Sequence, residues 1–462
     1  MKQILIFLIL GTFFTSCGIF KSAPERPTHR AEKERTTPRP KEPVEEREVE
    51  IIIPPIEEDE KTDTLGSTPA DEVLSFPRKD QYSFELILPL VAMDNGGLIT
   101  IPEEEESEYD LSGYSEDNET LLPFNQHFIN YMSGFLMALQ KLDGELPQFS
   151  YKINVRSSGD FDSLLVNEKD WSLSGNPDII IGGVSSAGVE QLSSLSAQNN
   201  LFYISPWITH QPFSDNPLMM QLTPGMEEYC RYIVDFLVEN SQSPAFTVMT
   251  SKSFDNRLNY FEDEVNELDS ALMLQTFIVD AFRSDSEPID LPEWFSKDKP
   301  NDIVIAMDRD ESFLYDALSY LQKWKDYEFN IYGFSSWKNY DLLHEFFDEG
   351  NIYLISHSHR RSNDSSYFSF ESDYYDRFSS LPSEWAIKGY DHGMFIGLGV
   401  STFGLDFYAF LDQTPYHGLQ LFFDFPTTAD EHIEGLSPLH IHTNQGVQLL
   451  EYRDKMFVPV KD

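Results

Sequence analysis

The stretch DIIIGGVSSAG, Asp178–Gly188, decides the fold that this sequence predicts. It joins a short, wholly apolar strand to two glycines and to two serines, Ser185 and Ser186, that open a helix. A strand without polar alternation is typical of a parallel sheet that helices cover on both faces. Ligands of such sheets bind at the carboxyl ends of the strands. The two hydroxyls can therefore cap the helix alone, or cap it and also bind an anion together with free backbone N–H groups.

Strands and helices alternate along the whole chain from Tyr82 onward. The first series of predicted strands is SFELILPL, YKINV, DIIIGG and LFYIS, and the second is AFTVMTS, LMLQTFIV, DIVIAM, FNIYGF and NIYLIS. Amphipathic segments separate these strands, among them about Ala187 to Gln198, MEEYCRYIVDFLVEN and ESFLYDALSYLQKW. The two series divide near Thr223–Pro224. This order predicts an α/β fold with two Rossmann-like lobes, each built on a parallel sheet.

These boundaries give the expected domain organisation. We expect one folded domain over residues 81–462, in which the first lobe takes about 81–223 and 351–410. The second lobe then takes about 224–350 and part of the C-terminal segment. A second polar segment at a strand end, LFYISPWITHQP, places Ser205, Trp207 and Thr209 beside the serines of the first, because the carboxyl ends of parallel strands share one edge.

In this order of elements the chain resembles the type I periplasmic binding protein superfamily, especially the branched-chain amino acid receptors of ABC transporters. The resemblance covers roughly Phe84 to Val458. It is carried by ELILPL, DIIIGGVSS, FYISPWIT, TSKSFDNRL and AIKGYDHGMFIGLGVSTFG, which occur in the family's order. It implies two lobes that close on a small ligand.

The resemblance also implies site residues, and the chain departs from the family at two of them. Ser186 and Thr209 match positions that hold the ligand carboxylate, and Phe254 falls where the family often has a stacking Tyr. Trp207 stands where a small residue is usual, and the segment YGFSSW around Ser335 lacks the acid that pairs the ligand ammonium. A buried ammonium without a counter-charge is costly, so ordinary free amino acids are disfavoured as ligands. The candidate ligand-binding residues are Ser185, Ser186, Trp207, Thr209, Phe254 and Ser335.

The N-terminus MKQILIFLILGTFFTSC, residues 1–17, has the charged start, apolar core and small-residue exit of a secretory signal peptide. Cys17 after Thr15 and Ser16 resembles the lipobox of bacterial lipoproteins, although Phe14 replaces the usual Leu. The apolar core is shorter than the about 20 residues that a membrane-spanning helix needs. We expect Cys17 to be lipidated, and the protein to be anchored in the bacterial cell envelope and to face the periplasm or the exterior.

Residues 18–80 are rich in Pro, Glu, Lys, Arg and Thr, a composition typical of a disordered tether. The formal net charge of the chain is −45, and from residue 81 onward 62 acidic residues oppose 21 basic ones. Such a surface repels nucleic acid and anionic lipid headgroups. Since Cys17 is assigned to lipidation, Cys230 has no disulfide partner, and we expect the core to hold the fold.

Other chemistry-bearing patterns are weak. The pairs His357/His359 and His440/His442 could each supply two metal ligands from a strand, but no third ligand is identifiable, so we expect no metal. The acidic run Glu103–Asp110 lacks the spacing of a calcium loop. No P-loop, nucleophile elbow or zinc-protease helix occurs, so we expect neither a cofactor nor an enzyme.

Two functions from different classes follow. The first is a lipid-anchored solute-binding protein that closes on a small ligand of unknown identity. The second is a regulatory or scaffold lipoprotein whose partner is an envelope protein, since outer-membrane activators of peptidoglycan synthases use this fold with an altered cleft. The long tether and Trp207 favour the second function, whereas Ser186 and Thr209 favour the first.

Overall fold

The computed structural model describes residues 77–90, 122–167, 171–208, 216, 218–251, 256–267, 272–279, 290–308, 310–347, 351–360, 364–413, 415–425 and 442–460. The signal peptide, Cys17, the tether up to residue 76 and the acidic run Glu103–Asp110 lie outside these ranges.

The first lobe is built on a sheet in which every pair of neighbouring strands is parallel, in the order β13-β5-β4-β3-β1-β2. Its strands are β1 (Gln81–Leu88), β2 (Ser150–Ser157), β3 (Ile179–Gly182), β4 (Phe202–Ser205), β5 (Met219–Gln221) and β13 (His442–Thr443). The helices of this lobe are α1 (Leu122–Glu145), α2 (Ser163–Asn167), α3 (Ser186–Asn199), α8 (Ser365–Phe378) and α9 (Glu384–Phe403). A small antiparallel pair, β11 (Tyr416–His417) and β12 (Phe422–Phe423), follows α9.

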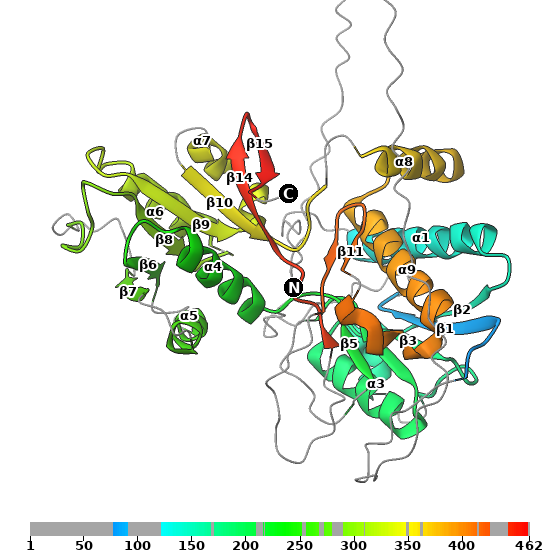
Figure 1. The fold of residues 1–462 in the computed structure, drawn as a ribbon. Helices are drawn as coiled ribbons and strands as arrows, with labels where there is room; N and C mark the ends of the chain where they lie inside the picture. Colours follow the sequence, from blue (N-terminus) through cyan, green and yellow to red (C-terminus); the bar gives the residue numbers. More distant parts are fainter. Residues whose placement is uncertain are drawn as a thin grey trace, which may run out of the picture. The chain divides into compact units, whose positions relative to one another are not determined.

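The apolar residues of β3 are buried on both faces of the first sheet. Ile179 and Ile181 pack into the core formed with α1 and α9, while Ile180 packs into the core formed with α3. Successive side chains of a strand point to opposite faces, so both faces of this strand are buried. In Figure 1, α1 (cyan) and α9 (orange) lie together on one side of the strands and α3 (green) lies on the other.

The second lobe has a mostly parallel sheet in the order β15-β14-β10-β9-β8-β6-β7. Its strands are β6 (Ala245–Thr250), β7 (Met273–Ile278), β8 (Asn301–Ile305), β9 (Phe329–Phe334), β10 (Asn351–Ser356), β14 (Gln448–Arg453) and β15 (Met456–Pro459). Its helices are α4 (Met226–Asn240), α5 (Asn256–Glu267), α6 (Glu311–Leu321) and α7 (His344–Phe347). Within this sheet, only β10–β14 and β14–β15 pair antiparallel among the described strands (Figure 1).

The apolar face that the sequence predicted for α6 is buried, and it packs on one side of this sheet. Helices α4 and α5 cover the other side, where Cys230 is fully buried and not in a disulfide. The predicted α/β class with two Rossmann-like lobes is therefore confirmed.

One expected boundary is wrong. We expected residues 351–410 in the first lobe, but β10 pairs in parallel with β9 inside the second sheet. The reason is that β9 and β10 are consecutive strands joined by a short helical connection, and such strands usually lie side by side. The chain thus leaves the second lobe after Ser356 rather than before Asn351. The described C-terminal strands divide, with β13 in the first sheet and β14 and β15 in the second.

Candidate functional site

The turn after β3 brings Ser185 and Ser186 to the carboxyl edge of the first sheet. Ser185 is the N-cap of α3, and its Oγ accepts a hydrogen bond from the Gly188 backbone N at 3.0 Å. The same hydroxyl donates to Oδ2 of Asp162 at 2.9 Å. The hydroxyl of Ser185 therefore already makes two hydrogen bonds within the protein. Ser186 begins α3 with an exposed side chain.

Asp162 fixes this turn from the loop after β2. Its fully buried carboxylate accepts hydrogen bonds from the backbone N of Val184 at 2.7 Å and of Ser185 at 2.8 Å. Burial raises the pKa of Asp162, while the hydrogen bonds from Val184 and Ser185 act in the opposite direction. A Cβ added at Gly188 would lie 2.0 Å from Oδ2 of Asp162, so only glycine leaves room for the carboxylate.

Trp207, after β4, packs into the core of the first lobe. Its ring meets those of Phe128 and Tyr131 of α1 edge-on, with centroids 5.2 and 5.0 Å apart. Its Nε1 is buried without a hydrogen-bond partner among the described residues. The side chain therefore contributes apolar packing between the end of β4 and α1, and it remains partly exposed.

At the carboxyl edge of the second sheet an ion pair joins α5 to the end of β8. The guanidinium of Arg257 lies 2.6 Å from the carboxylate of Asp308, and it also donates to the Ala306 backbone O at 3.4 Å. The same guanidinium lies over the ring of Phe334, 5.5 Å from its centroid. Both partners are mostly buried, with 12% and 16% of their side chains exposed, so this is a shielded pair rather than a loose surface contact.

The turn after β9 is filled by an indole. Trp337 is fully buried, its Nε1 donates to the Met307 backbone O at 2.9 Å, and its ring packs against Gly333. Ser335 opens the 3₁₀ turn Ser335–Asn339 and is half-buried. The turn itself carries no carboxylate, as the sequence indicated, but Asp308 supplies one at the same edge.

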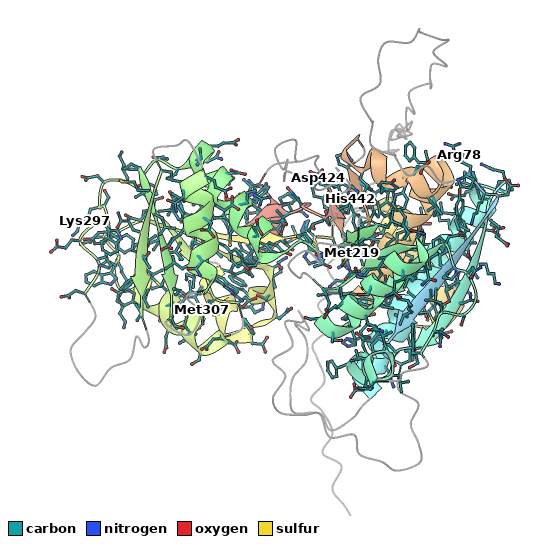
Figure 2. All side chains as sticks on the ribbon, turned by 90° about the horizontal axis from the view of Figure 1, so that it is seen from below. Arg78, Met219, Lys297, Met307, Asp424 and His442 are labelled. Carbon is teal, nitrogen blue, oxygen red and sulfur yellow. The ribbon has the colours of Figure 1, made fainter. Side chains whose placement is uncertain are left out.

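Among the described residues, three chain segments cross between the lobes, and Asn444 joins two of them, the crossing after β5 and the crossing before β14, to the segment around β12. Its Nδ2 donates to the backbone O of Leu222 at 2.9 Å and of Phe422 at 3.0 Å. Its Oδ1 accepts from the backbone N of Asp424 and of Gly446, each at 2.8 Å (Figure 2 labels Asp424). Because all these donors and acceptors are satisfied, the buried amide stabilises the crossing.

The crossing after β10 is tied to both lobes. Nδ1 of His357 lies 2.5 Å from Oη of Tyr229 in α4. The His359 backbone N donates to the Gln420 backbone O at 2.7 Å, which joins the crossing to the segment before β12. A polar cavity of about 80 Å³ lies there, with His359 and Gln420 in its lining.

Asp391 of α9 holds that same segment. Its fully buried carboxylate accepts from the backbone N of Leu419 at 2.6 Å and of Gln420 and Leu421 at 2.9 Å each. Burial raises the pKa of Asp391 to about 7, although the three N–H donors act in the opposite direction. The carboxyl group is therefore set to change its charge near neutral pH.

A pH dependence of stability follows. The pKa of Asp391 is raised from 3.8 to about 7 in the folded state, so the folded state holds the proton more tightly than the unfolded state. The contribution of protonated Asp391 to the unfolding free energy is fully present below the pKa of the unfolded state. It is lost as the pH rises through the pKa of the folded state. Between pH 5 and pH 8 the wild type should lose about 2–3 kcal/mol more unfolding free energy than Asp391→Asn. Urea unfolding at several pH values measures this, and parallel profiles of the two proteins would contradict it.

Comparison with solved structures places this architecture. A putative branched-chain amino acid ABC transporter from Rhodospirillum rubrum superposes with a TM-score of 0.54 at 15% identity, covering 82% of this chain and 99% of that one. An ABC transporter substrate-binding protein from Desulfitobacterium hafniense gives 0.50 at 14% identity, with 82% and 100% covered. The chain has the type I periplasmic binding protein fold. No protein-family model matches the sequence, and no curated protein matches it.

Within the type I periplasmic binding protein fold, the described candidate residues take different roles. Ser186 lies exposed at the edge of the first sheet, and Ser335 lies half-buried at the edge of the second. Ser185 and Trp207 are engaged in the fold through hydrogen bonding and packing. Thr209 and Phe254 lie outside the described residues, so their place at the site stays a prediction.

Sequence reasoning missed the charged residues of the site. Asp162 lies in the loop SGDFD, which matches no functional motif. Its hydrogen bonds are with the turn after β3, which is distant in the sequence. Arg257 and Asp308 each follow a predicted strand in the sequence, which could have marked them as neighbours at one edge. Their pairing depends on the strand order, in which β6 and β8 are adjacent.

Two further findings concern only the described part of the chain. It contains no cluster of three or more His, Cys, Asp or Glu side chains suited to a metal ion, and His440 lies outside it. Among its helices, none is both long enough and apolar enough to cross a membrane.

Proposed function

We propose that this protein is an extracytoplasmic solute-binding protein whose two lobes close on a small polar ligand. The observation that carries the proposal is the gathering of polar side chains at the carboxyl edges of both sheets, with Ser186 on one and the Arg257–Asp308 pair on the other. These edges are where open parallel sheets bind ligands. The similar structures from Rhodospirillum rubrum and Desulfitobacterium hafniense are of ABC transporter proteins, which supports this class.

The charges at the second edge bear on the class of ligand. A ligand ammonium would have to displace the guanidinium of Arg257 from Asp308, where the two lie 2.6 Å apart. Such a displacement would leave a shielded guanidinium unpaired, which is costly. We therefore propose a solute without a free ammonium group, such as a sugar, an amide or a carboxylic acid, rather than a free amino acid. Its polar groups would bond Ser186 and the outer edges of the ion pair.

Calorimetry of the purified full chain against free amino acids, amides, organic acids, sugars and peptidoglycan fragments tests this proposal. Ser186→Ala should lower the affinity for the bound solute about tenfold, because one hydrogen bond to a polar ligand is lost. Ser194→Ala, on an exposed position of the same helix, serves as the control and should leave the affinity unchanged. A free amino acid as the tightest ligand, or equal affinity in both variants, would contradict the proposal.

The second candidate is a scaffold lipoprotein that binds an envelope protein. Trp207 favours it, because its ring fills space between β4 and α1 where a ligand pocket of the family leaves room. Ser185 favours it as well, since its hydroxyl donates its hydrogen bond to Asp162 rather than to a ligand. If no solute binds in the calorimetric screen, this candidate becomes the better one.

We also propose that Cys17 is the lipid-bearing N-terminus of the mature protein. The sequence TSC after an apolar run supports this, since the thiol would be acylated there. Cells that express the wild type should incorporate radiolabelled fatty acid into the protein, and Cys17→Ala should abolish the label and leave unprocessed precursor. Cys230→Ala is the control, because that thiol is fully buried in α4. Unchanged labelling of Cys17→Ala would overturn the lipid anchor.

A further inference from the structure

Two loops of the second lobe bring three lysines to one shallow depression. Lys297 precedes β8, whereas Lys323 and Lys325 follow α6. They line a depression of about 310 Å³ together with Trp324, Asp326 and Tyr327. Lys297 and Met307, which precede and follow β8, lie at opposite ends of this strand (Figure 2). The depression is therefore at the amino edge of the sheet, away from the Arg257–Asp308 pair at the carboxyl edge.

This gathering of lysines stands out against the acidic chain. From residue 81 onward there are 12 lysines, and four of them, Lys297, Lys299, Lys323 and Lys325, lie on these two loops. Lys299 points elsewhere and donates to the Gln242 backbone O at 3.3 Å. A third of the lysines of the folded body thus belongs to about 30 residues, in a protein that otherwise repels anions.

Two of the three lysines of the depression have no ion-pair partner within the described part of the chain. Lys297 pairs with Asp326 at 3.4 Å and lies over the ring of Tyr327, 5.1 Å from its centroid. The side chains of Lys323 and Lys325 have no ion-pair or hydrogen-bond partner among the described residues, and both are exposed. Two ammonium groups are thus free to bind a carboxylate or a phosphate.

Aromatic rings form the rest of the lining. Trp324 and Tyr327 meet edge-on with centroids 6.3 Å apart, and Trp324 is also in contact with Tyr320 at 6.3 Å. Tyr327 in turn stacks on Phe329 with an interplanar angle of 10°. These contacts hold both rings in place, so the depression presents two ordered aromatic rings, set nearly at right angles, beside the two lysines.

We propose that this depression binds a short acidic saccharide. The ammonium groups of Lys323 and Lys325 pair with the carboxylate or phosphate of the sugar, and the rings of Trp324 and Tyr327 contact its C–H groups. A short ligand fits better than a long polyanion, because the net charge of −45 opposes a polymer that extends beyond the depression. A second site of this kind would hold the protein near acidic glycans independently of the ligand in its lobes.

The test is calorimetry of the full chain at low salt with trigalacturonate, which bears carboxylates, and with glucose 6-phosphate, which bears a phosphate. Binding of the first, the second or both supports the proposal and identifies the acid. The fully methyl-esterified trigalacturonate should bind at least tenfold more weakly, because it has lost its charge. Lys323→Gln combined with Lys325→Gln should weaken the binding of the acidic sugar at least tenfold.

Lys152→Gln combined with Lys455→Gln removes the same charge from exposed lysines elsewhere, and it should leave the affinity within twofold of the wild type. Ser186→Ala should also leave it unchanged, which separates this site from the solute site proposed above. Equal weakening by the two double variants, or no binding of either acidic sugar, would overturn the proposal.

Discussion

Replacing Gly389 with alanine should destabilise the protein by about 3 kcal/mol or more, because α1 and α9 touch through their backbones at this point. A Cβ at Gly389 would lie 2.0 Å from the Tyr131 backbone O, and one at Gly134 of the facing helix would lie 1.8 Å from the Ala386 backbone O. Neither backbone oxygen can rotate away as a flexible side chain would. The helices must separate, and the core between them and the first sheet loses its packing.

Gly144→Ala provides the control for this substitution. Gly144 lies in the last turn of the same α1, where an added Cβ would meet nothing within 4 Å. Alanine there should leave the stability unchanged or raise it by about 0.5–1 kcal/mol, because alanine has the higher helix propensity. Urea unfolding followed by circular dichroism measures both variants. Equal midpoints for Gly389→Ala and Gly144→Ala would show that the helices do not approach each other as closely as described.

Replacing Asp162 with alanine should cost about 3–5 kcal/mol of unfolding free energy, since two buried backbone N–H groups lose a charged acceptor. These are the N–H groups of Val184 and Ser185, which no longer have the carboxylate at 2.7 and 2.8 Å. The hydroxyl of Ser185 loses the same partner. The turn that presents Ser186 at the sheet edge should then loosen, so binding at the solute site should weaken together with stability.

Asp160→Ala is the matched control, because Asp160 lies in the same short 3₁₀ turn but its carboxylate accepts no hydrogen bond from the described residues of the turn after β3. Its removal should change the unfolding free energy by no more than about 0.5 kcal/mol, as for most partly exposed positions. The loss of unfolding free energy in Asp162→Asn should lie between those of Asp162→Ala and Asp160→Ala, since asparagine keeps one acceptor oxygen. If Asp162→Ala unfolds at the same urea concentration as Asp160→Ala, then the carboxylate does not hold the turn.

The fold could be predicted from short stretches, because a strand that is buried on both faces has consecutive apolar residues. Ile179, Ile180 and Ile181 are consecutive and apolar, and the structure buries them in two different cores. The stripe of α6 was visible in the same way, since helical periodicity records which face packs on a sheet. The sheet to which β10 belongs could not be predicted, because an apolar strand fits equally well into either sheet.

Of the site, the sequence located the edges but not the state of the side chains on them. Ser185 and Ser186 are neighbours with identical chemistry in the sequence, yet one is bonded to Asp162 and the other is exposed. The glycines of α9 were read only as part of a resemblance. Gly389, Gly393 and Gly397 repeat every four residues, so they lie on one face of the helix, and this spacing could have indicated a close helix contact.

The sequence by itself determined the alternation of buried strands and amphipathic helices, the division into two lobes and the acidic character of the chain. These properties are local or additive, since periodicity and charge depend on residues near one another or on their sum. Only the tertiary structure decided that the Ser185 hydroxyl donates a hydrogen bond to Asp162 and that Arg257 forms an ion pair with Asp308. It also decided that Lys323 and Lys325 line the same depression as Tyr327. Each of these depends on which strands are neighbours and on which loops meet at a sheet edge. Side chains distant in the chain become partners only when packing fixes their positions.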